Sequence, residues 1–285
     1  MRGEWLFAVL ALALALAPAA QGATIETFNL PNNQPTCGVA IADDGTVVGG
    51  NQAATNPPVN FIYGNGQFRY PAPNVPAGLV ALTGINRKNA IVGEDLATNG
   101  GFLGFRLRNS ATRLVTVPGA TQQAAIGIND SGSIVGWYET AGSTAEYGFI
   151  KHGNTVTTLD DGTGSTLPTA ISRDGTLVVG INLSADNITS WLYQNGAYTT
   201  LAAPGAAATF ARGVFGTGWV TGTVVSGSGS SALSHGFIYH SGQYKSFDIP
   251  GAQETEVAGA NARGEITGCY VDSLGTHGFI TKVRQ

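Results

Sequence analysis

The sequence predicts an all-β protein: a six-bladed β-propeller of four-stranded blades, closed by the N-terminal strand joining the last blade. Three observations carry this prediction. A short phrase recurs six times, an aromatic-led phrase separates its copies, and the two chain ends are complementary parts of one repeat. A fixed period of about 44 residues is typical of one supersecondary unit per repeat, stacked in an array.

The recurring phrase is clearest at Ile126–Tyr138, where a turn ends at Gly132 and a β-branched pair precedes Gly136. The closing glycines of the six copies, spaced 42 to 46 residues apart, are Gly49, Gly93, Gly136, Gly180, Gly222 and Gly268. A small residue also recurs near the start of each copy, at Ala40, Gly84, Gly127, Ala170, Gly213 and Gly259. These columns predict strands whose backbones approach one another closely.

Each copy contains a tight turn that joins two strands into a hairpin. The first turn position is Ala42, Asn86, Asn129, Ser172, Phe215 or Asn261. Asn and Ser favour turns there because they can bond their own backbone. The last position is Gly45, Asn89, Gly132, Gly175, Gly218 or Gly264. Gly and Asn tolerate a left-handed backbone that costs other residues more, as hairpin turns of this kind require.

The phrase between the copies predicts the second hairpin of each blade. It starts at an aromatic residue, which is Phe61, Phe105, Phe149, Trp191, Phe237 or Phe279. An apolar pair, a turn rich in Gly and Asn, and another strand follow. Because no window of the mature chain shows a sustained apolar period of 3.6 residues, we expect four strands per repeat and no helix.

Two stretches match a known pattern well: Pro118-Gly119-Ala120 through Gly148-Phe149, and Pro250-Gly251-Ala252 through His277-Gly278-Phe279. They resemble the HAF-type extracellular repeat of bacterial secreted proteins, and the resemblance spans nearly all of the mature chain. The fourth and fifth repeats depart from the pattern at Ser172, Thr189 and Phe215. The resemblance implies a β-propeller-like extracellular protein and carries no assigned catalytic residues.

Residues 1–22 have the pattern of a secretory signal peptide. Arg2 precedes an apolar run from Trp5 to Ala17, Pro18 breaks it, and small residues follow at Ala20 and Gly22. The alternative is a membrane anchor, which the short run and the cleavage pattern disfavour. Residues 23–285 then form a single propeller domain, expected outside the cytoplasm (extracellular or periplasmic) with no membrane insertion after cleavage.

The ends of the mature chain complete one blade. Thr24–Pro31 matches the fourth strand of a repeat without the first three, and Gly278–Val283 matches the third strand without a fourth. Pairing the two ends removes two exposed sheet edges, whereas a linear array would not need complementary half-repeats.

Composition restricts the partners. Charged residues make up 11% of the chain, and the formal net charge is −4 with the few Lys and Arg scattered. This gives no basic patch for nucleic acid. We expect a monomer whose partner is a glycan or an extracellular protein.

No residue pattern identifies a catalytic centre, a metal site or a cofactor. Neighbouring carboxylates such as Asp43-Asp44 point to opposite faces of a strand. Asp160-Asp161-Gly162 lacks the alternating ligands of a calcium loop. No two of the four histidines have metal-ligand spacing, and no Gly-x-Ser-x-Gly elbow is present. The prediction is therefore no catalytic residue, no metal and no cofactor.

The two cysteines predict a disulfide across the seam of the ring. Cys37 begins the first strand of the first repeat, and Cys269 ends the second strand of the last repeat. These blades are neighbours in a closed ring, and paired cysteines are common in secreted proteins. The alternative is two buried thiols.

A ligand site is predicted on the face with the longer, more variable loops, because binding residues usually lie on such loops. Aromatic and polar side chains expected around a shared depression at the axis are Trp137, Tyr138, Tyr147, His235, Tyr270, Asp272 and His277. Such a mixture could stack on a sugar or peptide and fix its orientation. The alternative is that Trp137 and Tyr270 only pack between blades.

These observations favour a secreted, non-enzymatic extracellular binding module for a glycan or surface partner. Two alternatives remain: a lyase or hydrolase that uses the central channel, and a structural surface or matrix protein. The fold alone does not decide, because propellers host many activities.

Overall fold

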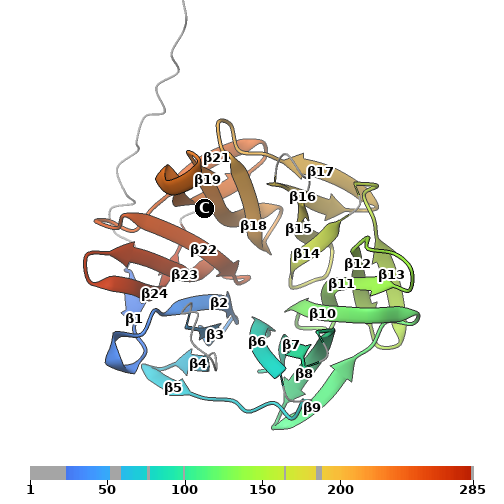
Figure 1. The fold of residues 1–285 in the computed structure, drawn as a ribbon. Helices are drawn as coiled ribbons and strands as arrows, with labels where there is room; N and C mark the ends of the chain where they lie inside the picture. The colour runs from blue at the N-terminus through green and yellow to red at the C-terminus, as the bar shows by residue number, and fades with distance from the viewer. Residues whose placement is uncertain are drawn as a thin grey trace, which may run out of the picture.

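The computed structural model describes residues 24–51, 59–75, 78–98, 100–163, 165–183 and 188–283, which form a ring of six blades around a central channel (Figure 1). Each blade is a four-stranded antiparallel sheet, and the strand that begins its repeat lies innermost. One parallel bridge, Ile188 with Ala208, also joins the fourth blade to the fifth. The predicted six-bladed β-propeller is confirmed.

The strands follow the predicted order in every blade. Blade 1 consists of β2 (Cys37–Ile41), β3 (Val47–Gly50), β4 (Asn60–Gly64) and β5 (Gln67–Arg69), and blade 2 of β6 (Gly78–Ile85), β7 (Ile91–Ala97), β8 (Phe102–Arg108) and β9 (Ala111–Val115). Blade 3 consists of β10 (Ala120–Ile128), β11 (Ile134–Thr140), β12 (Tyr147–His152) and β13 (Thr155–Leu159), and blade 4 of β14 (Thr166–Ile171), β15 (Leu177–Leu183), β16 (Ile188–Gln194) and β17 (Ala197–Leu201). Blade 5 consists of β18 (Ala208–Phe215), β19 (Trp219–Ser226), β20 (Leu233–His240) and β21 (Gln243–Phe247), and blade 6 of β22 (Glu254–Ala260), β23 (Glu265–Asp272), β24 (Gly275–Lys282) and the N-terminal β1 (Glu26–Phe28). Two short 3-10 turns, η1 (Pro31–Asn33) and η2 (Gly229–Ser231), lie between strands.

The N-terminal strand closes the ring as predicted. β1 pairs antiparallel with β24 and places Phe28 opposite Gly278. The Phe28 ring then packs into blade 1, stacked on Tyr63 at 4.5 Å between centroids and edge-on to Phe61 at 5.9 Å. One side chain therefore supports both the last blade and its seam with the first.

The closing glycine of every repeat lies directly opposite the aromatic residue of the second phrase. The six pairs are Gly49 with Phe61, Gly93 with Phe105, Gly136 with Phe149, Gly180 with Trp191, Gly222 with Phe237 and Gly268 with Phe279. Each of these aromatic side chains is at most 2% exposed. A Cβ at Gly136 would collide with the Ala124 carbonyl and lie 3.0 Å from the Phe149 ring. The two columns found in the sequence are thus a single packing unit, in which the glycine leaves room for the ring.

The tight turns also tie the blades together. All six last turn positions have the predicted left-handed backbone, with φ between 53° and 108°. At the first turn position, the Asn86 side chain donates to the Asn129 carbonyl of the next blade at 2.8 Å. Asn129 donates to Ser172 O at 3.3 Å, and Asn261 donates across the seam to Ala42 O at 2.9 Å. These asparagines therefore shape the turn and link neighbouring blades.

The predicted disulfide is present. Cys37 of β2 and Cys269 of β23 are bonded across the seam between blades 1 and 6, with their Cα atoms 4.7 Å apart. Both side chains are buried, and the alternative of two free thiols is wrong. The ring is thus closed twice, by strand pairing and by a covalent bond.

The predicted signal peptide, residues 1–22, lies outside the described residues. In the part of the chain that the structure describes, no helix is long and apolar enough to cross a membrane.

Candidate functional site

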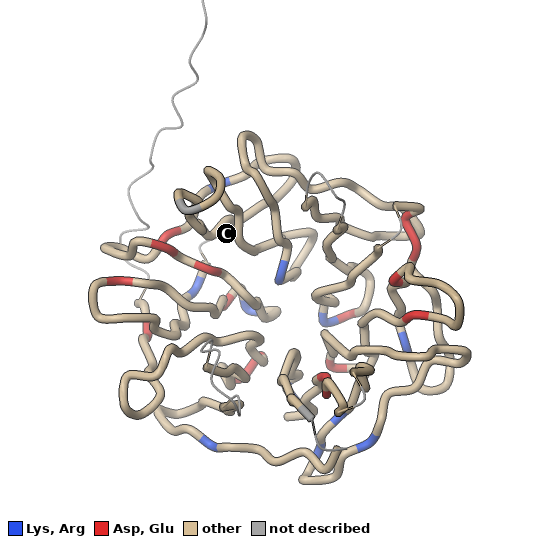
Figure 2. The backbone as a smooth tube through the Cα atoms, viewed as in Figure 1, with Lys and Arg blue, Asp and Glu red and all other residues tan. Residues whose placement is uncertain are grey.

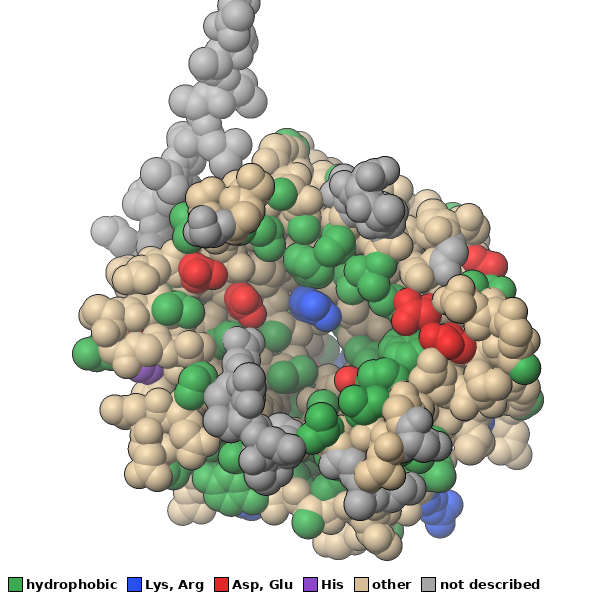
Figure 3. All heavy atoms as spheres, viewed as in Figure 1, with side chains coloured by type: hydrophobic (Ala, Val, Ile, Leu, Met, Phe, Trp, Pro, Cys, Tyr) green, Lys and Arg blue, Asp and Glu red, His purple; other side chains and the backbone are tan. Residues whose placement is uncertain are grey.

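The inner strand of every blade carries a β-bulge, and the bulge residues line the central channel. In each inner hairpin the pairing register skips the residue before the small-residue column, which is Val39, Thr83, Ile126, Thr169, Arg212 or Ala258. All six lie on the wall of a cavity of about 520 Å³. Figure 3 shows the surface hollowed at the centre of the ring. Because a bulge interrupts the alternation of side chains along a strand, it re-aims one residue per blade.

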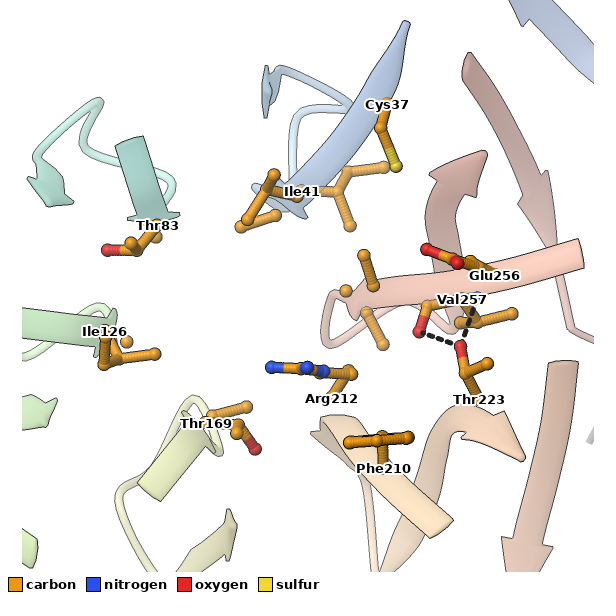
Figure 4. Close-up of a pocket in the computed structure, with 18 of the residues that line it drawn as sticks. Cys37, Ile41, Thr83, Ile126, Thr169, Phe210, Arg212, Thr223, Glu256 and Val257 are labelled. Atoms are coloured by element: carbon orange, nitrogen blue, oxygen red, sulfur yellow. Dashed lines mark hydrogen bonds between the residues drawn. The ribbon is translucent and has the colours of Figure 1, made fainter. Parts of the chain in front are cut away.

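Arg212 is the one charged bulge residue, and its guanidinium points into the cavity (Figure 4). Its Cζ lies 5.5 Å from the centroid of the Phe210 ring, within the range of a cation–π contact. Among the described residues it makes no hydrogen bond or ion pair. Burial lowers the pKa of the Arg212 guanidinium, and the negative charge of Glu256 opposes this shift. An arginine nevertheless stays charged, so the cavity contains an unpaired cation.

Two carboxylates share the cavity wall with Arg212. Glu256 of β22 belongs to the neighbouring blade, and its carboxylate points toward the seam, with Oε2 4.0 Å from Cys269 Sγ (Figure 4). Glu94 of β7 belongs to blade 2, which lies across the channel from blade 5 (Figure 1). Burial raises the pKa of the Glu94 carboxyl. Three blades thus each supply one charged group to the cavity.

The threonines of the bulge column hold the blades rather than presenting free hydroxyls. Thr83 Oγ1 donates to Ala125 O of the next blade at 2.7 Å, and Thr169 Oγ1 donates to Ala211 O at 2.7 Å. Within the bulge column, the side-chain donors that remain for a ligand are therefore those of Arg212.

An ion-pair network crosses the channel on the face of the tight turns. Arg173 of blade 4 lies 3.3 Å from Asp43 of blade 1, on the opposite side of the ring, and 3.1 Å from Asp130 of blade 3. Arg87 also pairs with Asp130, at 3.0 Å. These turns surround only a small cavity of about 50 Å³. Side chains of the network therefore span this mouth of the channel (Figure 2 shows the charged residues around the channel).

The seven residues predicted from the sequence are not brought together at the axis. None of them lines the central cavity. In blade 3, Tyr138 is buried and its hydroxyl lies 3.0 Å from Thr158 Oγ1. Trp137 packs edge-on against Phe102 of blade 2 at 5.3 Å, and Tyr147 lies 5.7 Å from the Tyr138 ring. These three side chains therefore pack between and within blades, and they do not line the central cavity.

The remaining four lie in blades 5 and 6. His235 pairs with Asp248 at 3.2 Å. His277 lies between Asn29 Oδ1 at 2.7 Å and Asp272 Oδ1 at 3.0 Å, next to the Tyr270 ring. Since Asn29 follows β1, this group reinforces the closing seam. Direct ligand contact by any of the seven stays a prediction.

Arg212 and Glu256 were not singled out from the sequence. The signal was present in the aligned repeats, because the column Val39, Thr83, Ile126, Thr169, Arg212 and Ala258 contains a single charge. What the sequence did not reveal is that this column is bulged and faces the channel.

A metal site is not supported by the donors present. Among the described residues, the group of three possible ligands that lies close enough is Cys37, Glu256 and Cys269. Both of its sulfur atoms are consumed in the disulfide, which leaves one carboxylate. This set does not fit a metal ion, because cysteine binds metals as a thiolate and both sulfur atoms are here bonded to each other.

Asp95, next to Glu94 on β7, is a buried carboxylate whose removal should stabilise the protein. Its side chain is 0% exposed, and neither oxygen has a hydrogen-bond partner among the described residues. Burial raises its pKa, so in the folded protein the charged form is disfavoured. We expect Asp95→Asn to raise the denaturant midpoint at about pH 7, where the wild type must keep or neutralise this charge.

The stability gained by Asp95→Asn should depend on pH in a defined direction. A raised folded-state pKa means that wild-type stability improves as the pH falls through that pKa toward the unfolded value near 4. The advantage of Asp95→Asn should therefore shrink over the same range. An equal advantage at all pH values would contradict the assignment, and Asp44→Asn, at an exposed turn, is the control.

Solved structures with the same architecture show what this fold is similar to. A TolB-like protein from Agrobacterium tumefaciens aligns over 92% of this chain and 99% of its own, with 14% identity and a TM-score of 0.59. A gluconolactonase from Xanthomonas campestris aligns over 94% and 93%, with 12% identity and a TM-score of 0.58. The Aleuria aurantia lectin, in complex with Fucα1-6GlcNAc, aligns over 90% and 94%, with 12% identity and a TM-score of 0.53.

No family model and no curated protein matches the chain, so the HAF-type resemblance stays an expectation. Identities of 12–14% show the fold alone. Fold and cavity together define a closed six-bladed β-propeller whose axis contains a charged, half-buried cavity.

Proposed function

We propose that this protein is a non-enzymatic binding module that acts outside the cytoplasm and receives part of a glycan in its central cavity. The observation that carries the proposal is the unpaired guanidinium of Arg212, directed into a cavity of about 520 Å³. A cavity of this size falls within the range of small-molecule sites, which combine apolar walls with a few placed polar groups.

The chemistry of the wall suits a polyhydroxylated ligand. Hydroxyl groups both donate and accept hydrogen bonds, so Arg212 can serve as donor while Glu94 and Glu256 serve as acceptors. The remaining lining is largely aliphatic, including Ile126 and Val257. The Aleuria lectin, whose structure contains a bound fucosylated sugar, supports the use of such a ring as a sugar-binding scaffold.

The compartment is supported by the disulfide. Disulfides persist in oxidising environments such as the periplasm and the extracellular space. The bond between Cys37 and Cys269 therefore agrees with the secretion expected from residues 1–22.

The test is a glycan-array screen of residues 23–285, followed by calorimetric titration of each positive glycan. We expect at least one glycan to bind and Arg212→Ala to weaken it, with an unchanged melting temperature. If no glycan binds, or if Arg212→Ala binds as well as the wild type, the proposal is wrong. Turnover of a bound glycan would favour the alternative of a channel-based lyase or hydrolase.

A further inference from the structure

We infer that the central cavity is specific for an acidic sugar: the carboxylate of a terminal uronic acid residue pairs with Arg212, while the sugar hydroxyls donate to Glu256 and Glu94. This inference rests on the proposed function and adds the class of ligand. It concerns residues from three blades that meet only in the closed ring.

The surroundings of Arg212 indicate that the ligand carries a carboxylate. Its guanidinium is half-buried, stands against the Phe210 ring and points away from the Glu256 carboxylate (Figure 4). A charge removed from bulk water without a partner is unfavourable, so the site gains when an anion arrives. The planar fork of arginine matches a carboxylate with two parallel hydrogen bonds, which a neutral hydroxyl cannot supply.

Glu94 and Glu256 indicate that the ligand also carries hydroxyl groups. Both lie on the cavity wall, and a carboxylate offers about four acceptor positions on two oxygens. A hexuronic acid presents several hydroxyl donors on the same ring as its single carboxylate. A peptide carboxyl terminus offers one backbone N–H donor per residue beside a carbonyl acceptor, fewer donors than the hydroxyls of one hexuronic acid ring, which makes the peptide the poorer fit.

The charge balance separates a carboxylate from a phosphate. One cation and two carboxyl groups line the cavity. Burial raises the pKa of the Glu94 carboxyl, which indicates that this part of the wall is poorly hydrated and hydrates an added charge less well than bulk water. A monoanion can pair with Arg212 and keep its distance from the glutamates. A dianionic phosphate carries twice the charge and gains no second cation, so it should bind less well.

The shape of the channel favours the terminal residue of a glycan over an internal one. The Arg173 network crosses the tight-turn mouth, and the cavity wall continues past the bulges to Phe210 and Glu256, toward the other end of the inner strands. A glycan that enters from the long-loop face therefore places a terminal residue at Arg212, and internal residues of a polymer would not reach it.

The experiment titrates the disulfide-intact protein, residues 23–285, with two matched ligands by calorimetry. Methyl β-glucuronide and methyl β-glucoside share every hydroxyl except that the glucuronide carries a carboxylate in place of one hydroxymethyl group. We expect the wild type to bind the glucuronide about tenfold more tightly or better, as for a hydrogen-bonded charged pair. Glucose 6-phosphate and an acetylated dipeptide should bind more weakly than the glucuronide.

Two variants of Arg212 and one control complete the test. Arg212→Gln should abolish the preference for the glucuronide, and Arg212→Lys, which keeps the charge without the fork, should leave a reduced preference. Arg113→Gln, on the exposed outer strand of blade 2, should leave both affinities unchanged. Melting temperatures verify that each variant is folded, and Arg212→Lys carries the test if Arg212→Gln does not fold.

The outcomes separate this inference from the proposed function. Equal affinities for the two methyl sugars, tighter binding of the phosphate or the dipeptide, or a preference that survives loss of Arg212 would overturn the acidic-sugar inference. Neutral glycans could still bind in that case, and the proposed function would stand. Failure of every sugar in the array and in both titrations would overturn both.

Discussion

Replacing Phe28 with Ala is expected to lower the free energy of unfolding by about 3–5 kcal/mol, the usual range for a buried aromatic side chain. Phe28 is 3% exposed and contacts Phe61, Tyr63 and Phe68 of blade 1 from the last blade's outer strand. Its loss leaves a cavity at the seam and loosens β1, which alone covers the edge of β24. Chemical denaturation measures the change.

The control for Phe28→Ala is Tyr70→Ala, at an aromatic side chain that is 56% exposed and should cost little. Deleting residues 24–31 extends the test, because an unpaired β24 edge should make the protein melt earlier and associate. A deletion variant with the stability of the wild type would mean that β1 does not close the ring.

Removing the disulfide is the second change with a large expected effect. The bond joins residues separated by 232 positions, so it restricts nearly the whole unfolded chain. Loss of such a bond typically costs about 2–5 kcal/mol. For a domain of this size that corresponds to a fall in melting temperature of about 4–20 °C in the variant with both Cys37→Ala and Cys269→Ala.

Reductant supplies the matched control for the cysteine variant. The wild type should melt at the temperature of the double variant once its thiols are shown to be free, and reductant should not affect the double variant. If the fully reduced wild type keeps its melting temperature, the covalent bond contributes nothing to ring closure, and strand pairing alone holds the seam.

Much of the fold could be predicted because the same local sequence features occur in all six repeats. The closing glycines, the left-handed turn positions and the aromatic column each recur in all six blades, and each follows from backbone geometry or packing inside one blade. The complementary ends and the two cysteines then predicted closure. These features depend on neighbours that are close in sequence, or on the plain fact that a ring brings its first and last blades together.

The candidate site could be predicted less well, because it depends on contacts between distant blades. Tyr138 looks like an exposed loop-edge aromatic in the sequence, yet it is buried in blade 3. Arg173 looks like a turn residue, yet it reaches Asp43 of the opposite blade. Neither relation has a local signature, since each arises only when sheets pack side by side.

By itself, then, the sequence determined the number of blades, their strands, the closing strand and the covalent seam, because these repeat in the chain or follow from its ends. The tertiary structure alone decided which side chains face the axis. Each inner strand skips the residue before its small-residue column, which rotates that residue toward the channel, and the strict alternation assumed for a strand misses this shift. Arg212 therefore became a candidate binding residue only when the bulge and the opposing blade of Glu94 were in place.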